Sequence, residues 1–321
     1  MSCYLYDLLT RHIAVDPAKI FIETSDGRAI AYSDLDVDSA RLAGALRKLG
    51  VEKGDRVAVQ VEKSPQAVLL YLACLRCGAV FLPLNTAYTP AEIEYFLADS
   101  GATLFVCDPT RCDVLAPVAA KAGVRAVETL GMRQDGSLMQ RAAAESTAFA
   151  NAECGPEDLA AILYTSGTTG RSKGAMLTHA NLASNAKTLV DTWHFTDTDV
   201  LIHALPIYHT HGLFVAINVT LIAGASMIFL PKLDPEEILR LMPRATALMG
   251  VPTFYTRLLQ QDGLMRAATA SMRHFISGSA PLLAETHRAW QARTGHAILE
   301  RYGMTETNMN TSNPYDGDRI A

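Results

Sequence analysis

Short apolar runs alternate with amphipathic segments along most of the chain, and this alternation predicts strands and helices in turn. Strands are expected at residues 20–23, 29–32, 56–61, 79–84, 103–107, 126–130, 159–164, 200–205, 226–230, 247–250, 275–276 and 297–301. Helices are expected at residues 5–12, 33–49, 65–77, 90–99, 114–122, 178–193, 212–223, 235–242, 253–259 and 283–293. Strands and helices that alternate in this way favour an α/β fold, with parallel sheets covered by helices on both faces.

Several helix starts carry their own signal. Thr89-Pro90-Ala91-Glu92 has the residues of a capping box with proline at the first helical position. Ser33 and Asp234 are expected to cap the helices that follow them. Residues 131–156 are polar and poorly periodic, so we expect a linker there.

Composition narrows the class of protein. The 321 residues are 49% hydrophobic and 19% charged, as in a folded globular chain. A net charge of -5 without a run of Lys and Arg argues against nucleic acid as a partner. No apolar stretch has membrane-spanning length, and residues 1–12 lack the pattern of a secretory signal. The oligomeric state is left open.

Six cysteines in a chain of this length do not form a disulfide framework. Cys74 and Cys77 have the spacing of a redox or zinc pair, but they lie in an apolar, helix-like run. We therefore expect buried structural thiols and a cytoplasmic protein.

A glycine-rich loop stands out at residues 164–174, with the sequence Tyr-Thr-Ser-Gly-Thr-Thr-Gly-Arg-Ser-Lys-Gly. An apolar strand is expected before it and a helix after it, which is an order that builds anion sites for polyphosphates. It is not a Walker loop, because Lys173 is followed by Gly174 instead of Ser or Thr. The alternative, a surface connector that binds nothing, is disfavoured by the density of glycine, hydroxyl and lysine residues.

Three other polar segments also follow predicted strands, from residues 206, 277 and 302 onward. The carboxyl ends of parallel strands meet at one edge of a sheet, where open α/β folds bind ligands. The four segments are therefore expected to form one cleft.

The glycine-rich loop resembles the phosphate signature of the adenylate-forming superfamily, which contains acyl-CoA synthetases, peptide-synthetase adenylation domains and firefly-type luciferases. Leu205-Pro206-Ile207-Tyr208-His209 and Tyr302-Gly303-Met304-Thr305-Glu306-Thr307 match the same family in the same order. The resemblance implies two packed, parallel-type sheets flanked by helices, with approximate subdomains at residues 1–50 plus 200–321 and at 51–199. It also implies activation of a carboxylate by ATP and Mg²⁺ as an acyl-adenylate, and its transfer to CoA.

The resemblance assigns roles residue by residue. The β- and γ-phosphates would be held by Thr165, Ser166, Gly167, Thr168, Thr169, Gly170 and Lys173. The nucleotide would further contact Ser279, Ala280, Pro281, Tyr302, Gly303 and Thr305, and the metal Glu306 and Thr168. The acid would contact His209, Arg257, Ser277, Ser279, Arg301 and Met304, and the residues of catalysis would be Lys173, His209, Thr305 and Glu306. His209 and His211 could instead be a metal pair, but no third ligand is evident nearby.

Two arginines, Arg257 and Arg301, indicate which carboxylic acid is the substrate. Related ligases often carry Gln-Gly before the Tyr-Gly-Met-Thr-Glu motif, where this chain has Glu300-Arg301. Arg257 follows another predicted strand, and a guanidinium suits a second carboxylate better than a fatty tail. This pattern resembles malonyl-CoA synthetases and indicates malonate or methylmalonate. The alternative is that Arg257 and Arg301 form structural ion pairs, for instance with Glu300.

Members of the family continue beyond the point that corresponds to Ala321, with a small mobile domain that carries the adenylation lysine. We therefore expect a fragment that binds ATP weakly at best and does not complete thioester formation. Other readings remain: a fatty or aryl acyl-CoA ligase, an adenylation domain that loads a carrier protein, a luciferase-like oxygenase, or an inactive nucleotide-binding module.

Overall fold

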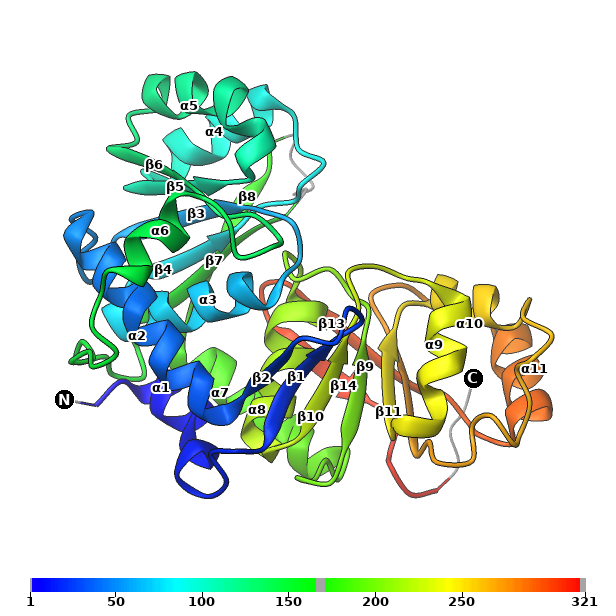
Figure 1. Cartoon of the computed structure of the whole chain (residues 1–321). Helices are drawn as coiled ribbons and strands as arrows, with labels where there is room; N and C mark the ends of the chain where they lie inside the picture. Colours follow the sequence, from blue (N-terminus) through cyan, green and yellow to red (C-terminus); the bar gives the residue numbers. More distant parts are fainter. Residues whose placement is uncertain (1, 166–170, 318–321) are drawn as a thin grey trace. The chain divides into compact units, whose positions relative to one another are not determined.

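The computed structural model describes residues 2–165 and 171–317 (Figure 1). Two compact units are formed, one by residues 1–18 and 32–183 and the other by residues 19–31 and 184–321. These ranges differ from the subdomains expected from the sequence. Helix α2 (Tyr32–Lys48) belongs to the first unit because it packs on α3 (Pro65–Cys77) and α6 (Ser137–Ala143).

The first unit contains a six-stranded sheet in the order β6-β5-β3-β4-β7-β8. Its strands are β3 (Arg56–Gln60), β4 (Val80–Pro83), β5 (Leu104–Cys107), β6 (Ala126–Thr129), β7 (Leu159–Thr165) and β8 (Lys173–Thr178). All neighbours are parallel except β7 and β8. Figure 1 shows α4 (Pro90–Ser100) and α5 (Cys112–Lys121) on one face, and α2, α3 and α6 on the other.

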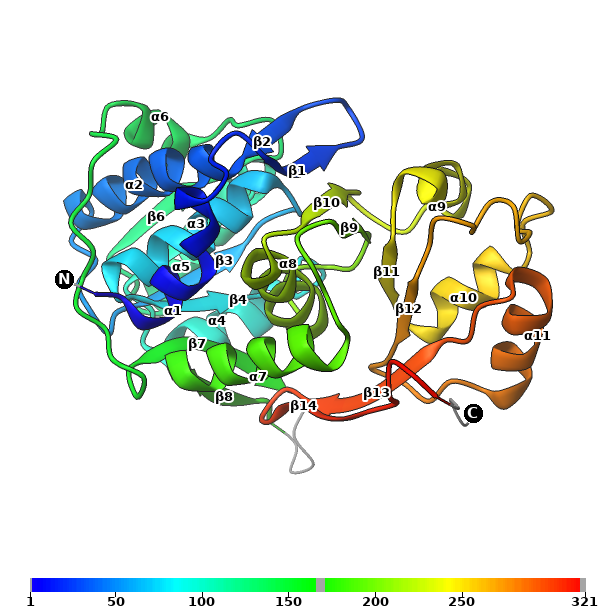
Figure 2. The same ribbon diagram turned by 90° about the horizontal axis from the view of Figure 1, so that it is seen from below.

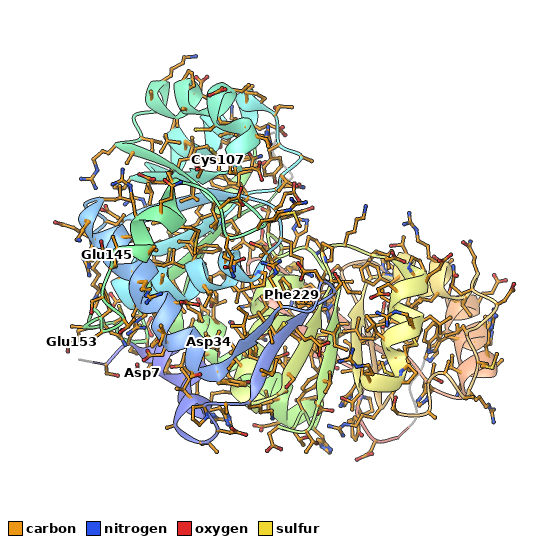
Figure 3. All side chains as sticks on the ribbon, viewed as in Figure 1. Asp7, Asp34, Cys107, Glu145, Glu153 and Phe229 are labelled. Atoms are coloured by element: carbon orange, nitrogen blue, oxygen red, sulfur yellow. The ribbon has the colours of Figure 1, made fainter. Side chains whose placement is uncertain are left out.

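The helices of this unit follow from their sequences. Every residue of α3 is buried, as expected for a helix that is apolar all round. The Ser64 hydroxyl caps its start, and Gly78 ends it with a left-handed φ of 68°. Thr89 and Glu92 form the predicted capping box of α4. On α2, Lys48 pairs with Glu145 at 2.8 Å (labelled in Figure 3).

The second unit contains an eight-stranded sheet in the order β14-β13-β12-β11-β9-β10-β1-β2. Its strands are β1 (Ile20–Thr24), β2 (Ala29–Ala31), β9 (Val200–His203), β10 (Ser226–Phe229), β11 (Ala247–Gly250), β12 (His274–Ser277), β13 (Leu299–Met304) and β14 (Asn308–Ser312). The inner neighbours are parallel, and each edge is antiparallel. Figure 2 shows α10 (Pro252–Leu258) beside β12, and α11 (Ala284–Thr294) next to α10.

The predicted α/β class with two mainly parallel sheets flanked by helices is confirmed. Some elements differ from the expectation. The expected linker at residues 131–156 contains α6, and α2 begins at Tyr32, one residue before the expected cap. The helix expected at residues 212–223 is a π-helical segment, His211–Ile217, followed by α8 (Asn218–Ala223). Among the described residues, no helix combines the length and apolar composition needed to cross a membrane.

Candidate functional site

The second unit has a cavity of about 440 Å³ at the carboxyl ends of its central strands. Strand β9 lies between β10 and β11, so the chain order along the sheet reverses there. Such a switch point is the usual ligand site of an open parallel sheet. The cavity is lined by Leu205, Pro206, His209, Thr210, His211, Gly212, Val251, Ser279, Arg301, Gly303, Met304, Thr305 and Met309.

Arg301 is the charged residue of this cavity. Only 4% of the residue is exposed, and burial lowers its pKa to about 10, so the guanidinium is still charged at neutral pH. Its Nε and Nη2 atoms have no hydrogen-bond partner among the described residues. Removing a charge from water is costly unless an opposite charge meets it. The cavity therefore has the electrostatics of an anion site.

Glu300 does not neutralise Arg301. The Oε1 atom of Glu300 accepts a hydrogen bond from the backbone N–H of Leu282 at 2.9 Å. In the part of the chain that the structure describes, none of the ion pairs includes Arg301. The structural ion pair considered for Arg301 is thus not formed there.

Arg257 lies elsewhere. It is exposed on α10 and lines neither of the two cavities described here. The chain turns into a helix directly after β11, and this places Arg257 on its exposed side. Arg301 is the arginine that lines the cavity.

A second cavity of about 520 Å³ is lined by Ser279, Ala280, Pro281, Glu300, Arg301, Tyr302, Gly303, Thr311, Ser312 and Asn313. It shares Ser279, Arg301 and Gly303 with the first. Tyr302 is 55% exposed, so its ring is available for stacking. Apart from Arg257 and Ser277, the expected nucleotide and acid residues of the second unit thus border one or both of two neighbouring cavities. Ser277 differs: its hydroxyl is buried at the end of β12 and lines neither.

The Tyr-Gly-Met-Thr-Glu motif was expected to follow a strand, but its first three residues are part of the strand. Strand β13 continues through Met304 and pairs with β14, and Thr305 and Glu306 form the connection between them. Thr305 lines the first cavity, and Glu306 presents an exposed carboxylate. No cluster of three or more His, Cys, Asp or Glu side chains suited to a metal occurs among the described residues. A single carboxylate fits Mg²⁺ that takes most of its ligands from phosphates and water.

The glycine-rich loop joins two antiparallel strands, which corrects the expected strand–loop–helix order. Thr165 ends β7 and faces Lys173 at the start of β8; α7 (His179–Thr192) begins only after β8. The helix start therefore does not border the loop. Ser166, Gly167, Thr168, Thr169 and Gly170 lie outside the described residues.

Both ends of this loop are fixed to α4. The Tyr164 hydroxyl donates to Asp99 at 2.6 Å, and the Tyr95 hydroxyl donates to the carbonyl of Ser172 at 2.8 Å. Lys173 is exposed, so its ammonium group can reach a ligand.

His209 and His211 have different environments. His209 is an exposed residue of the cavity wall, and its ring packs edge-on against Tyr208. His211 is 4% exposed, and its Nδ1 atom lies 3.4 Å from the Ser279 hydroxyl. The sequence had indicated His211 only as half of a metal pair, because burial between distant segments leaves no local pattern.

Residues 9–320 match the family model described as AMP-binding enzyme. The chain therefore belongs to the AMP-binding enzyme family, which confirms the superfamily predicted from the three motifs.

Individual relatives are more specific. The chain is 34% identical over 297 residues to the mitochondrial malonate–CoA ligase ACSF3 of Mus musculus, covering 87% of this chain and 50% of that protein. It is 35% identical over 287 residues to a feruloyl-CoA synthase of Amycolatopsis, and the match covers 87% of this chain and 55% of the synthase. The crystal structure of ATP-bound MatB from Rhodopseudomonas palustris is similar with a TM-score of 0.96 and 62% identity, covering 100% of this chain and 63% of MatB. The chain spans about half the length of the curated relatives it matches.

Proposed function

We propose that the protein is an ATP-dependent malonate–CoA ligase that activates malonate or methylmalonate as an acyl-adenylate and transfers the acyl group to CoA. The observation that carries this proposal is the buried, charged Arg301 in the cavity wall. A fatty or aromatic tail would leave this charge without a counterion, whereas the second carboxylate of a diacid pairs with a guanidinium bidentately. The malonate–CoA ligases among the relatives support the same substrate.

The chemistry needs no nucleophilic side chain. A carboxylate oxygen of the diacid attacks the α-phosphorus of ATP and pyrophosphate leaves; the CoA thiolate then attacks the carbonyl carbon and AMP leaves. The protein contributes positioning and charge neutralisation. Arg301 and Ser279 hold the distal carboxylate, and Met304 borders the acid.

The nucleotide contacts are those that the family motifs imply. Lys173, Thr165 and the loop residues 166–170 hold the β- and γ-phosphates, and Thr305 contacts the α-phosphate. Tyr302 and Gly303, with the turn at residues 279–281, hold the adenine. Mg²⁺, when bound, neutralises phosphate charge; Glu306 and Thr168 would be its protein ligands. His209 borders the acyl and CoA entrance.

We further infer a reducing compartment such as the cytoplasm. All six cysteines are free thiols, including Cys107 at the end of β5 (labelled in Figure 3). Free thiols are typical of proteins kept under reducing conditions. Small molecules are the partners that the site accommodates.

The decisive test is calorimetric binding of carboxylates to the 321-residue chain, in the presence of Mg²⁺ and a non-hydrolysable ATP analogue. Malonate is expected to bind more tightly than acetate, benzoate or ferulate. Arg301→Gln should weaken malonate binding by roughly 10- to 100-fold, as expected for loss of a charged hydrogen bond. Arg288→Gln, on the exposed side of α11, is the matched control and should have no effect. Equal binding of malonate by the Arg301→Gln variant would contradict the proposal.

A catalytic test follows malonate-dependent exchange of pyrophosphate into ATP. It is run on the chain alone and on the chain joined to the part of R. palustris MatB that it does not cover. Exchange with malonate but not with acetate or ferulate is expected for the joined protein. Exchange driven by an aromatic or fatty acid instead would favour the alternative acyl-CoA ligases.

A further inference from the structure

The backbone around His211 is tightly constrained. A Cβ atom at Gly212 would lie 2.0 Å from the carbonyl oxygen of Pro206, so only glycine fits there. The Gly212 carbonyl accepts a hydrogen bond from His203 Nε2 at 2.7 Å. His211 also opens the π-helical segment, and π-helical turns are rare and frequent at functional sites. These contacts fix the backbone that carries His211.

The ring of His211 faces one hydroxyl. Its Nδ1 atom lies 3.4 Å from the Ser279 Oγ atom, and among the described residues this is the only hydrogen-bond contact of that hydroxyl. Burial, together with the charge of Arg301, holds the pKa of His211 well below its usual value. The ring is therefore neutral and carries a single N–H.

Ser279 is itself held in an unusual conformation. Its φ of 70° lies in the left-handed region, which residues with a Cβ rarely adopt. It follows Gly278, over which the Arg301 guanidinium lies: a Cβ at Gly278 would be 2.5 Å from Arg301 Cζ. Ser279 and Arg301 border the same cavity, and strained residues of this kind are concentrated at functional sites.

We propose that His211 is a positioning residue for diacid binding, whose Nδ1–H donates to Ser279 Oγ so that the Ser279 hydroxyl proton donates to the carboxylate held by Arg301. A carboxylate only accepts hydrogen bonds. If Nδ1 were the acceptor instead, the Ser279 hydroxyl would donate its proton to His211. The Ser279 oxygen would then face the carboxylate as a second acceptor, and no hydrogen bond would form between them. The inference rests on the proposed function and adds a residue that selects the second carboxylate.

Two amide substitutions separate the ring nitrogens. In His211→Asn the amide can take the place of Nδ1, whereas in His211→Gln it reaches the place of Nε2. Malonate affinity, measured by calorimetry as above, should stay within about threefold of wild type in His211→Asn. It should fall roughly tenfold in His211→Gln, the size expected for one lost hydrogen bond.

A double-mutant cycle tests whether His211 acts through Ser279. In the Ser279→Ala background, His211→Gln should cause no further loss of malonate affinity, because the coupled contact is already gone. Nitrogen chemical shifts of the labelled histidine in wild type should show a protonated Nδ1. His179→Gln, a buried histidine of the first unit, is the matched control: it should lower the melting temperature but leave malonate affinity unchanged.

The outcomes are distinct. Rescue by His211→Gln but not His211→Asn, additive losses in the cycle, or a proton on Nε2 would overturn the role of His211. If wild type does not bind malonate, or if Arg301→Gln binds it normally, the proposed function itself fails and this inference falls with it.

Discussion

At the scale of single residues, the charge of the cavity depends on the close approach of the Arg301 guanidinium to the backbone of Gly278. Gly278 is buried directly after β12, and Arg301 on β13 lies across it. The missing side chain of Gly278 provides the space that the charge occupies. The position of Arg301 is therefore decided by a neighbour 23 residues earlier in the chain (301 − 278).

Gly278→Ala should move the guanidinium, because the new methyl group would lie 2.5 Å from Arg301 Cζ. Overpacking of this kind costs about 1–3 kcal/mol. We expect malonate affinity, measured by calorimetry, to fall at least roughly tenfold. Gly155→Ala is the control, since its nearest neighbour would be 3.9 Å away. Unchanged affinity in Gly278→Ala would show that the guanidinium can shift without consequence.

At the scale of elements, a buried histidine joins the start of the chain to α7. His179 is fully buried, and its Nδ1 atom accepts a hydrogen bond from the backbone N–H of Leu5 at 3.3 Å. That residue lies in α1 (Tyr4–Leu9), which also packs on α3. Protonation of Nδ1 would remove the acceptor and place a charge in the core.

This contact predicts a dependence of stability on pH. Burial lowers the pKa of His179 from 6.5 to about 4, so between these values the unfolded chain binds more protons than the folded chain. Stability is therefore fully present above pH 6.5 and falls as the pH drops towards 4, by about 3 kcal/mol in total.

Urea denaturation of wild type and His179→Asn at several pH values between 7 and 4.5 measures this effect. The asparagine variant can keep an acceptor but does not titrate, so its stability should change less over this range. Parallel pH profiles of the two proteins would assign the loss to other groups.

At the scale of the whole molecule, binding of a ligand should appear as added stability of the folded chain. Lys173 and Glu306 are the two charged residues proposed to contact ATP and its Mg²⁺. A ligand that binds only the folded chain raises its stability by mass action, by about 2.7 kcal/mol at 100 times the dissociation constant. Both residues should therefore influence the same stability change.

We expect Mg²⁺ and ATP together to raise the melting temperature of wild type, and Lys173→Ala and Glu306→Gln each to reduce this rise at the same ligand concentration. Differential scanning fluorimetry measures it. The controls are Lys121→Ala in the first unit and Glu236→Gln in the second, both exposed and away from the motifs. A full rise in either Lys173→Ala or Glu306→Gln would remove that residue from the proposed ATP site.

Local patterns were enough for most of the fold. Alternating apolar segments, the capping box of α4 and the apolar run of α3 each act over a few residues, so the sequence shows them directly. Strand β8 was missed because only Leu177 of its six residues is buried, which leaves no alternating pattern. α6 was missed because it is a short helix of seven residues inside a polar stretch.

The amino-acid sequence by itself determined the α/β class, the order of the three motifs and hence the family. It also presented Arg257 and Arg301 as equal candidates for the acid, and it gave His211 no role beyond half of a possible metal pair with His209. Only the tertiary structure separated them: Arg301 is buried over Gly278 while Arg257 is exposed, and His211 is buried against Ser279 while His209 is exposed. The physical reason is that the burial and the electrostatic environment of each side chain depend on which distant segments come together at the carboxyl ends of β9, β11, β12 and β13. Contacts between distant segments leave no local pattern in the sequence.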